Sequence, residues 1–325
     1  MTTAQINRRG LPVELTKRLS LPLIAAPMFR VSGPELVIAA CQSGVIGTFP
    51  TANCRSLEDL DHWLNRIKGA LTPQDAPYCP NLIMKRDSMQ DELKCLIQHR
   101  VEMVITSVGS PKPAVAPLHD IGCLVFADVA TIAHAHKALD AGVDGLILLT
   151  AGAGGQTGWA NGLSFARGVR KFFGGPLILA GGISDGAALL AAQALGCDLG
   201  YMGTRFIATQ ESMASQEYKQ MVVDSELDDI LLSKAFTGLE TNMLKPSIVA
   251  AGLDPAQLPT NISEERARAL YGSGGQAPTR WRDIWSAGHT VSGAERISSV
   301  AELVGQLKQE YKEATTQARL HIPSL

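Results

Sequence analysis

Residues 176–205 read PLILAGGISDGAALLAAQALGCDLGYMGTR, and this stretch decides the fold. It starts with a short apolar run, passes through a Gly-Gly turn into a helical pattern, and returns through Gly196 to a second apolar run ending at Met202. A glycine just beyond a helix can adopt the left-handed conformation that ends it. We therefore interpret the stretch as a strand–helix–strand unit whose helix is capped by Ser184.

The same pattern continues toward the N-terminus. Ala141-Gly142-Val143-Asp144 precedes an apolar run, as Leu195-Gly196-Cys197-Asp198 does, and a helix is expected over Ala130–Ala141. The apolar runs lack in/out alternation, which is typical of parallel strands buried on both faces. Strands are expected at Leu21–Pro27, Val45–Phe49, Tyr78–Met84, Val101–Thr106, Cys123–Ala127, Gly145–Leu149, Pro176–Ala180 and Asp198–Met202.

Eight strands alternating with helices fit an α/β fold, the closed (β/α)8 TIM barrel. The alternative is an open doubly wound sheet. It is disfavoured because the first turn, Pro27–Gly33, lacks the Gly-x-Gly-x-x-Gly fingerprint.

The pattern changes after Thr204, where charge and turn residues increase. We expect the barrel to comprise residues 1–207 and 286–325, and residues 208–285 to form a smaller inserted helical cap. The expected helices of the cap are Ser212–Leu232 and Ser263–Tyr271, and a final helix over about Val300–Ala318 is expected to return to the barrel.

Composition excludes several functional classes. With 29 basic and 31 acidic residues, the chain has no electrostatic footprint for nucleic acid or an anionic membrane. The six cysteines form no Cys-x-x-Cys pair, and no His/Cys/carboxylate spacing suggests a metal site. The N-terminal residues lack the apolar core of a signal peptide, and no apolar run approaches the ~20 residues that span a bilayer. A soluble cytoplasmic protein acting on a small molecule is expected.

Glycine-rich turns follow the last three predicted strands, at residues 151–158, 180–184 and 202–205. In a barrel the carboxyl ends of all strands open on one face. Glycine lets backbone N–H groups approach an anion closely, and the following helix N-termini add aligned dipoles. The last two turns therefore predict a phosphate site. Pro27 and Met28, with Asn81, are placed to wall a flat cofactor beside it.

These residues together resemble the nitronate monooxygenase (2-nitropropane dioxygenase) family, over about residues 20–310. The motifs that carry the resemblance are Ala25-Ala26-Pro27-Met28, Asn81, the Ala-Gly-Gly turn at 180–182, Met202-Gly203-Thr204-Arg205-Phe206 and Ile284-Trp285-Ser286-Ala287-Gly288. The resemblance implies a TIM barrel with a smaller helical domain, FMN as cofactor, and oxidation of alkyl nitronates by O2 to carbonyl compounds and nitrite.

The resemblance also implies roles for residues of this chain. Ala26, Pro27 and Met28 would line the flavin ring, and Asn81 would bond its polar edge. Backbone N–H groups of Gly181, Gly182, Gly203 and Thr204 would hold the phosphate. Gly154 and Gly155 would pack near the ring, and Ser286 would come from the hairpin that closes the site.

Two positions depart from the family pattern. Gln156 stands where the family's glycine loop carries a histidine, and Asp128 stands after the fifth strand, beside the expected flavin, where lysine is frequent. Glutamine is no base near neutral pH, but a nitronate is already deprotonated and needs mainly to be positioned. Gln156 is therefore expected to orient the substrate. Asp128 is expected to disfavour extra negative charge on a reduced flavin. His289 is the histidine best placed to face the site.

Two other functions stay open. The chain could reduce a quinone or an enoyl thioester with NAD(P)H, as related branches of the family do. It could also bind flavin with little catalysis, as a sensor or assembly partner. The helices of the cap offer a surface for a homodimer.

Overall fold

The computed structural model describes residues 10–260, 262–272 and 278–321. Its centre is a closed barrel of eight parallel strands, which confirms the predicted barrel and shows that the open-sheet alternative is wrong. The barrel closes where Ile24 on the first strand pairs with Tyr201 on the last. The strands are β1 (Leu23–Ala25), β2 (Ile46–Pro50), β3 (Tyr78–Ile83), β4 (Met103–Ser107), β5 (Leu124–Val129), β6 (Gly145–Leu149), β8 (Leu177–Ala180) and β9 (Leu199–Met202).

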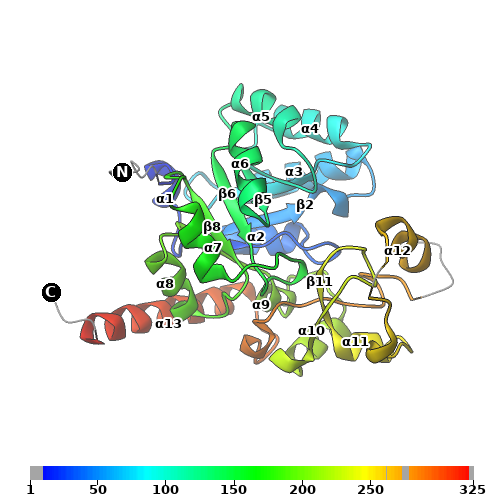
Figure 1. The fold of residues 1–325 in the computed structure, drawn as a ribbon. Helices are drawn as coiled ribbons and strands as arrows, with labels where there is room; N and C mark the ends of the chain where they lie inside the picture. The colour runs from blue at the N-terminus through cyan, green and yellow to red at the C-terminus, as the bar shows by residue number, and fades with distance from the viewer. Residues whose placement is uncertain (1–9, 261, 273–277, 322–325) are drawn as a thin grey trace, which may run out of the picture.

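Helices cover the outside of the barrel (Figure 1). They are α2 (Pro34–Gln42), α3 (Leu57–Ala70), α4 (Met89–Gln98), α5 (Lys112–His119), α6 (Ile132–Asp140), α7 (Gly162–Val169), α8 (Gly186–Ala194) and α13 (Val300–His321), with a short α1 (Val13–Thr16) before the first strand. The final helix packs against α8 and α2, as expected of a segment that returns to the barrel. A Cβ at Gly186 would lie 2.0 Å from the backbone nitrogen of Tyr311, so glycine permits this close helix contact.

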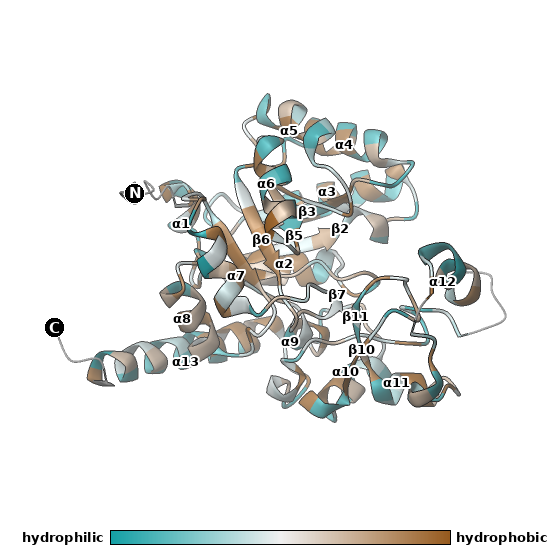
Figure 2. Ribbon diagram, in the orientation of Figure 1, coloured by the Kyte–Doolittle hydropathy of each residue, from teal (hydrophilic) through white to brown (hydrophobic). Residues whose placement is uncertain are grey.

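The strands are buried on both faces, which explains their unbroken apolar runs. Inside the barrel, side chains such as Ile46, Phe126 and Ile178 form one cluster. Outside it, a larger cluster joins strands to helices through residues such as Leu36, Leu64 and Leu146. Figure 2 shows the apolar strands at the centre and hydrophilic residues on the outer helices. All six cysteines are buried free thiols and act as small hydrophobic side chains.

The helix caps differ slightly from expectation. Asp185, not Ser184, caps α8, because its carboxylate accepts a hydrogen bond from the Ala188 N–H at 2.7 Å. The Ser184 carbonyl instead accepts a hydrogen bond from the Arg205 side chain at 2.9 Å. The helix after β5 starts at Ile132, with Thr131 as its cap.

The segment from 208 to 285 is not purely helical, and the expected helix over Ser212–Leu232 is present only over Gln216–Val223. The helices in this segment are α10 (Gln216–Val223), α11 (Lys245–Ala250) and α12 (Glu264–Tyr271), and the short α9 (Thr204–Ile207) directly precedes it. Between α10 and α11, β10 (Ile230–Ser233) and β11 (Thr241–Leu244) pair in antiparallel fashion. The apolar residues of β10 therefore serve a strand rather than a continued helix. Short 3-10 turns lie at Thr51–Asn53, Leu227–Asp229, Pro255–Gln257 and Val291–Gly293.

A third strand of this small sheet comes from the barrel. β7 (Gly155–Gln156) lies in the loop after β6 and pairs with β11 through Gly155↔Asn242 and Gln156↔Thr241. The loop that was predicted to approach the cofactor is thus part of the inserted segment's sheet. No helix in the described residues is long and apolar enough to cross a membrane.

Candidate functional site

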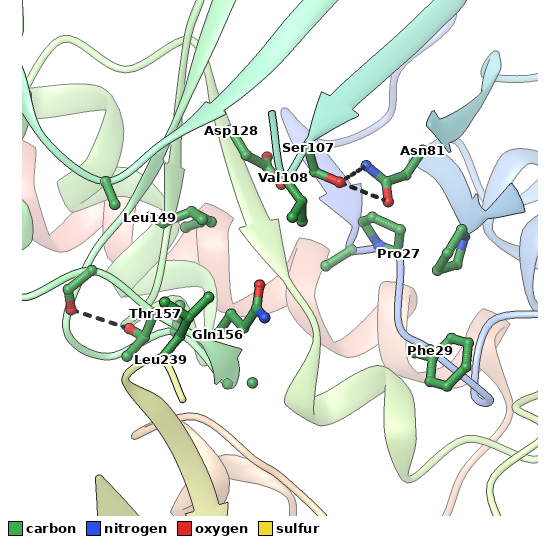
Figure 3. Close-up of a pocket in the computed structure, with 18 of the residues that line it drawn as sticks. Pro27, Phe29, Asn81, Ser107, Val108, Asp128, Leu149, Gln156, Thr157 and Leu239 are labelled. Carbon is green, nitrogen blue, oxygen red and sulfur yellow. Dashed lines mark hydrogen bonds between the residues drawn. The ribbon is translucent and has the colours of Figure 1, made fainter. Parts of the chain in front are cut away.

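A cavity of about 1760 Å³ opens at the carboxyl ends of the barrel strands, between the barrel and the inserted segment. Typical small-molecule pockets measure roughly 300–1,000 Å³. The cavity therefore has room for a large cofactor and a substrate together. Figure 3 shows some of the side chains that line it.

One wall is the turn after β1. Ala26, Pro27 and Met28 all line the cavity, as predicted from the Ala-Pro-Met motif. The turn is fixed from both sides, because the Met28 N–H donates to the Ser32 hydroxyl at 3.0 Å and the Met28 carbonyl accepts from the Asn53 amide at 3.1 Å. These hydrogen bonds fix the backbone that presents the apolar side chains of Ala26, Pro27 and Met28 to the cavity.

The floor combines Asn81 with a partner that the sequence analysis missed. The Asn81 amide donates to the Ser107 hydroxyl at 3.0 Å, and both residues are buried (Figure 3). Ser107 ends β4, so the predicted strand Val101–Thr106 stops one residue short of it. The next residue, Val108, has φ +51° and also lines the cavity. A left-handed conformation is costly for a β-branched residue, and such residues concentrate at functional sites.

Asp128 also faces the cavity, but it lies within β5 rather than after it. Its Oδ1 atom is buried and has no hydrogen-bond partner among the residues that the structure describes. Burial disfavours the charged form and raises the pKa of the Asp128 carboxyl to about 7. Tyr201 on β9 lines the same floor, and burial raises the pKa of its phenol well above the usual value.

The glycine turn after β8 has the geometry of a cradle. Gly181 and Gly182 have φ of +102° and +85° and line the cavity. A Cβ at Gly181 would lie 2.4 Å from the Thr150 hydroxyl, whereas a Cβ at Gly182 would meet nothing within 4 Å. The turn is therefore packed from behind and open in front. Open space before left-handed glycines suits an anion bound by backbone N–H groups.

The turn after β9 supplies less of a helix dipole than expected. Gly203 and Thr204 line the cavity, but α9 has only four residues, so the dipole argument does not apply there. The Thr204 hydroxyl accepts a hydrogen bond from the Gly288 N–H at 2.9 Å and so joins this turn to the segment at 286–289.

The glycine loop after β6 packs closely on that same segment. A Cβ at Gly154 would lie 2.7 Å from the Gly288 nitrogen, so the two backbones touch. Gly155 has φ +70° and lies beside Ser286. The loop carries Gln156, whose exposed side chain projects into the cavity (Figure 3). Gln156 is therefore the polar side chain of this loop that is free to contact a ligand.

Asn242, on β11, holds the glycine loop in place and was not anticipated. It is fully buried, and its amide donates to the carbonyls of Ala151 and Ala153 at 2.8 and 2.7 Å. Nothing in the sequence marks it, because it acts on residues about ninety positions away. Trp281, with φ +67°, also lines the cavity and was not anticipated.

The two remaining candidates, Ser286 and His289, differ in their position relative to the cavity. Ser286 lines the cavity, and its carbonyl accepts a hydrogen bond from the Tyr218 hydroxyl. His289 does not line the cavity. It is exposed, and its backbone N–H donates to the Gly152 carbonyl at 3.0 Å.

One group of metal-type ligands was not anticipated. In the described ranges, Asp61, Cys95 and His99 have ligand atoms within 4.8 Å of one another. They lie on α3 and at α4, outside the barrel, where His99 and Asp61 already pair at 2.7 Å. They are not part of the cavity.

Comparison with known proteins agrees with this architecture. Residues 86–310 match the family model described as nitronate monooxygenase. The chain is 26% identical to a nitronate monooxygenase of Paraburkholderia phytofirmans, over 92% of this chain and 94% of that protein. A solved nitroalkane oxidase from Streptomyces ansochromogenes has a TM-score of 0.79 at 24% identity, over 94% of this chain and 99% of the other.

A relative of another kind is also similar. The chain is 27% identical to (3aS,4S,5R,7aS)-5-hydroxy-7a-methyl-1-oxo-octahydro-1H-indene-4-carboxyl-CoA dehydrogenase of Rhodococcus jostii. That match covers 70% of this chain and 64% of the relative, so the chain spans less than two thirds of it. The family model, by contrast, covers more than half of the chain, and it includes the glycine loop, both glycine turns and the segment at 286–289. The chain therefore belongs to the nitronate monooxygenase family, a family of flavin-dependent oxidoreductases.

Proposed function

We propose that the protein binds FMN at this cavity and oxidises alkyl nitronates with O2 to carbonyl compounds and nitrite. The observation that carries the proposal is the open cradle at Gly181 and Gly182, beside Gly203 and Thr204, in a cavity that Ala26, Pro27 and Met28 also line. Backbone N–H groups of these residues would bind the phosphate. Ala26, Pro27 and Met28 would line the flavin, and Asn81 would bond its polar edge.

The residues of the chain fit this cofactor in two ways. The turn at Gly182 has free space in front of it, which a side chain would fill. The floor also offers polar groups, Asn81 and Asp128, to a ring with a polar edge. Bound FMN would supply the electron transfer between substrate and O2.

The protein's own contribution is then mainly positioning. A nitronate carries its negative charge on the nitro-type oxygens and needs no base to remove a proton. The Gln156 amide can donate hydrogen bonds to those oxygens from the glycine loop. Ser286, on the segment that packs against this loop, would close the site from the other side.

The test is a spectrum and a turnover assay on the purified full-length protein. We expect a yellow protein that retains FMN and consumes O2 with propionate 3-nitronate, releasing nitrite. A colourless protein with no affinity for FMN would refute the proposal. Tight FMN retention without reduction by any donor would instead indicate the flavin-binding protein with little catalysis.

A second function is favoured by the charge of the cavity. Eight Lys and Arg residues line it against four carboxylates, namely Arg30, Lys85, Arg86, Lys112, Lys137, Lys234, Arg268 and Arg280 against Asp128, Asp140, Glu240 and Glu264. This excess of positive charge suits a phosphate-bearing partner such as NAD(P)H or a CoA thioester, and one relative is a CoA-substrate dehydrogenase. The second candidate is therefore NAD(P)H-dependent reduction of an enoyl thioester or a quinone. Anaerobic bleaching of the flavin by NADH or NADPH, but not by a nitronate, would favour it.

A further inference from the structure

An unpartnered carboxyl lies at the floor of the cavity. Asp128 is on β5 at the level of Ile147 on β6. On the other side, Thr106 pairs with Ala127, which places Ser107 beside Asp128. The Asp128 Oδ1 atom is buried, and no hydrogen bond or ion pair of this carboxyl is found among the residues that the structure describes.

The groups around Asp128 do not compensate a negative charge. From β4, Ser107 is already engaged with Asn81 at 3.0 Å. From β6, the facing side chains are Ile147 and Leu149, which are apolar. From β9 and β3, the titratable groups are the phenol of Tyr201 and the thiol of Cys79. Burial is the main cause that raises the pKa of both groups, and the nearby Asp128 adds a smaller contribution in the same direction.

The cations of the cavity lie elsewhere. Lys85 and Lys112 are exposed, on the loop after β3 and at the start of α5, and Lys137 is exposed on α6. Burial is the sole cause of the shift in the pKa of Asp128, so none of these cations offsets it. With its pKa raised to about 7 by burial, the Asp128 carboxyl is mostly neutral at pH values below 7.

We propose that Asp128 acts as a neutral acid whose hydroxyl donates a hydrogen bond to an acceptor atom of the flavin ring, so that ionisation of Asp128 weakens flavin binding. This inference rests on the proposed flavin site. The polar edge of a flavin presents one donor, N3–H, and several acceptors, which are the two carbonyl oxygens and the ring nitrogens N1 and N5; the proposed hydrogen bond goes to one of these acceptors. A carboxylate offers acceptors alone and would repel them, whereas a carboxylic acid offers one donor.

The direction of the pH dependence follows from linkage. In the flavin-free protein the pKa of the Asp128 carboxyl is about 7. Because the flavin binds the neutral form, binding raises this pKa further. Affinity is therefore full below pH 7 and is lost as the pH rises above that value. If the ionised form does not bind, affinity falls tenfold for each further pH unit, so the ratio between pH 6 and pH 8.5 is at most about 30-fold.

Riboflavin is the probe, because it lacks the phosphate whose own ionisation would affect FMN binding near pH 6. Its dissociation constant is measured by flavin fluorescence with the flavin-free full-length protein at pH 6 and pH 8.5. For the wild type we expect weaker binding at pH 8.5, approaching the 30-fold limit. Asp128→Asn keeps a donor but does not titrate, so its affinity should be the same at both pH values.

Two variants serve as controls. Asp128→Leu has no donor and should bind riboflavin weakly at both pH values. Asp140→Asn changes an exposed carboxylate that lines the outer part of the same cavity, and it should keep the wild-type pH dependence. Carbon-13 NMR of the Asp128 carboxyl in the wild-type protein reports its titration directly, whether or not the variants fold.

The outcomes separate this inference from the proposed function. Riboflavin that binds equally well at both pH values, or an Asp128 carboxyl that titrates near pH 4, overturns the role of Asp128 and leaves the flavin site standing. If Asp128→Asn loses as much riboflavin affinity between pH 6 and pH 8.5 as the wild type does, the role of Asp128 is likewise overturned and the flavin site stands. If neither riboflavin nor FMN binds at pH 6, the proposed function fails and this inference fails with it.

Discussion

Replacing Asn242 by alanine should loosen the glycine loop without unfolding the protein. Asn242 makes two buried hydrogen bonds, to Ala151 and Ala153, from a strand of the inserted segment. Each such bond contributes about 1 kcal/mol, and each buried carbonyl left without a partner costs about 1–3 kcal/mol. The Asn242 Oδ1 atom is itself buried without a partner, so its removal returns part of this cost. The expected net loss is about 2–4 kcal/mol.

The effect should be local as well as global. Gln156 lies three residues beyond Ala153, on the loop that Asn242 holds, so its position should become less defined. A loss of 1.4 kcal/mol in transition-state stabilisation is a tenfold loss in rate. We expect Asn242→Ala to lower kcat/KM at least tenfold and to speed amide hydrogen exchange at residues 151–157. Urea denaturation gives the stability change.

The matched control is Asn65→Ala. Asn65 is exposed on α3 and donates one hydrogen bond to Asp61 at 3.0 Å, far from the cavity. Such a surface change should stay within about 0.5 kcal/mol. Wild-type stability, exchange and turnover in Asn242→Ala would refute the idea that this side chain fixes the loop.

Three further predictions concern Gly181, Gln156 and Gly186. Gly181→Ala places a Cβ 2.4 Å from the Thr150 hydroxyl at a residue with φ +102°. It should weaken FMN binding at least tenfold by fluorescence titration, while Gly69→Ala, with nothing within 4 Å, should leave it unchanged. Gln156→Glu should raise KM for a nitronate at least tenfold through like-charge repulsion with no change in Tm, and an unaltered KM would argue against contact with substrate. Gly186→Ala should destabilise the protein by about 3 kcal/mol or more, because the added Cβ would separate α8 from α13. Gly305→Ala, at an exposed and uncrowded position on α13, should instead stabilise the protein by about 0.5–1 kcal/mol. Equal melting temperatures for these two variants would contradict the packing argument.

The barrel could be predicted from the sequence because its signals are local. The strand at Gly145–Leu149 has the predicted bounds, and Leu177–Ala180 differs from prediction by one residue. Each strand is an apolar run bounded by a glycine or polar turn, so neighbouring residues suffice to find it. The glycine turns open on the cavity for the same reason, since their place in the barrel follows from strand order.

The inserted segment and the floor of the site depend on distant contacts. The apolar residues of Ile230–Ser233 fit the buried face of a helix as well as a strand. Its pairing with Thr241–Leu244 is what makes this segment a strand. The Oδ1 atom of Asp128 likewise is buried because β5 lies between β4 and β6, so the raised pKa of this carboxyl is not encoded in its neighbours along the chain. The sequence could show that Asp128 departs from a lysine pattern, but it could not show that the carboxyl lacks a partner.

The position of Gln156 depends on both parts of the chain at once. Its own strand pairs with Thr241, while the glycines before it pack against the backbone of Ala287 and Gly288. The barrel supplies the loop, and the inserted segment determines where its side chain points. A change in the inserted segment can therefore alter what Gln156 contacts while the phosphate cradle at Gly181 and Gly182 stays intact. Under the proposed function, we therefore expect barrel residues to determine FMN binding, and the pairing of β7 with β11 to determine which substrate Gln156 contacts. Variants of β11 should accordingly change KM for the substrate more than the dissociation constant of FMN.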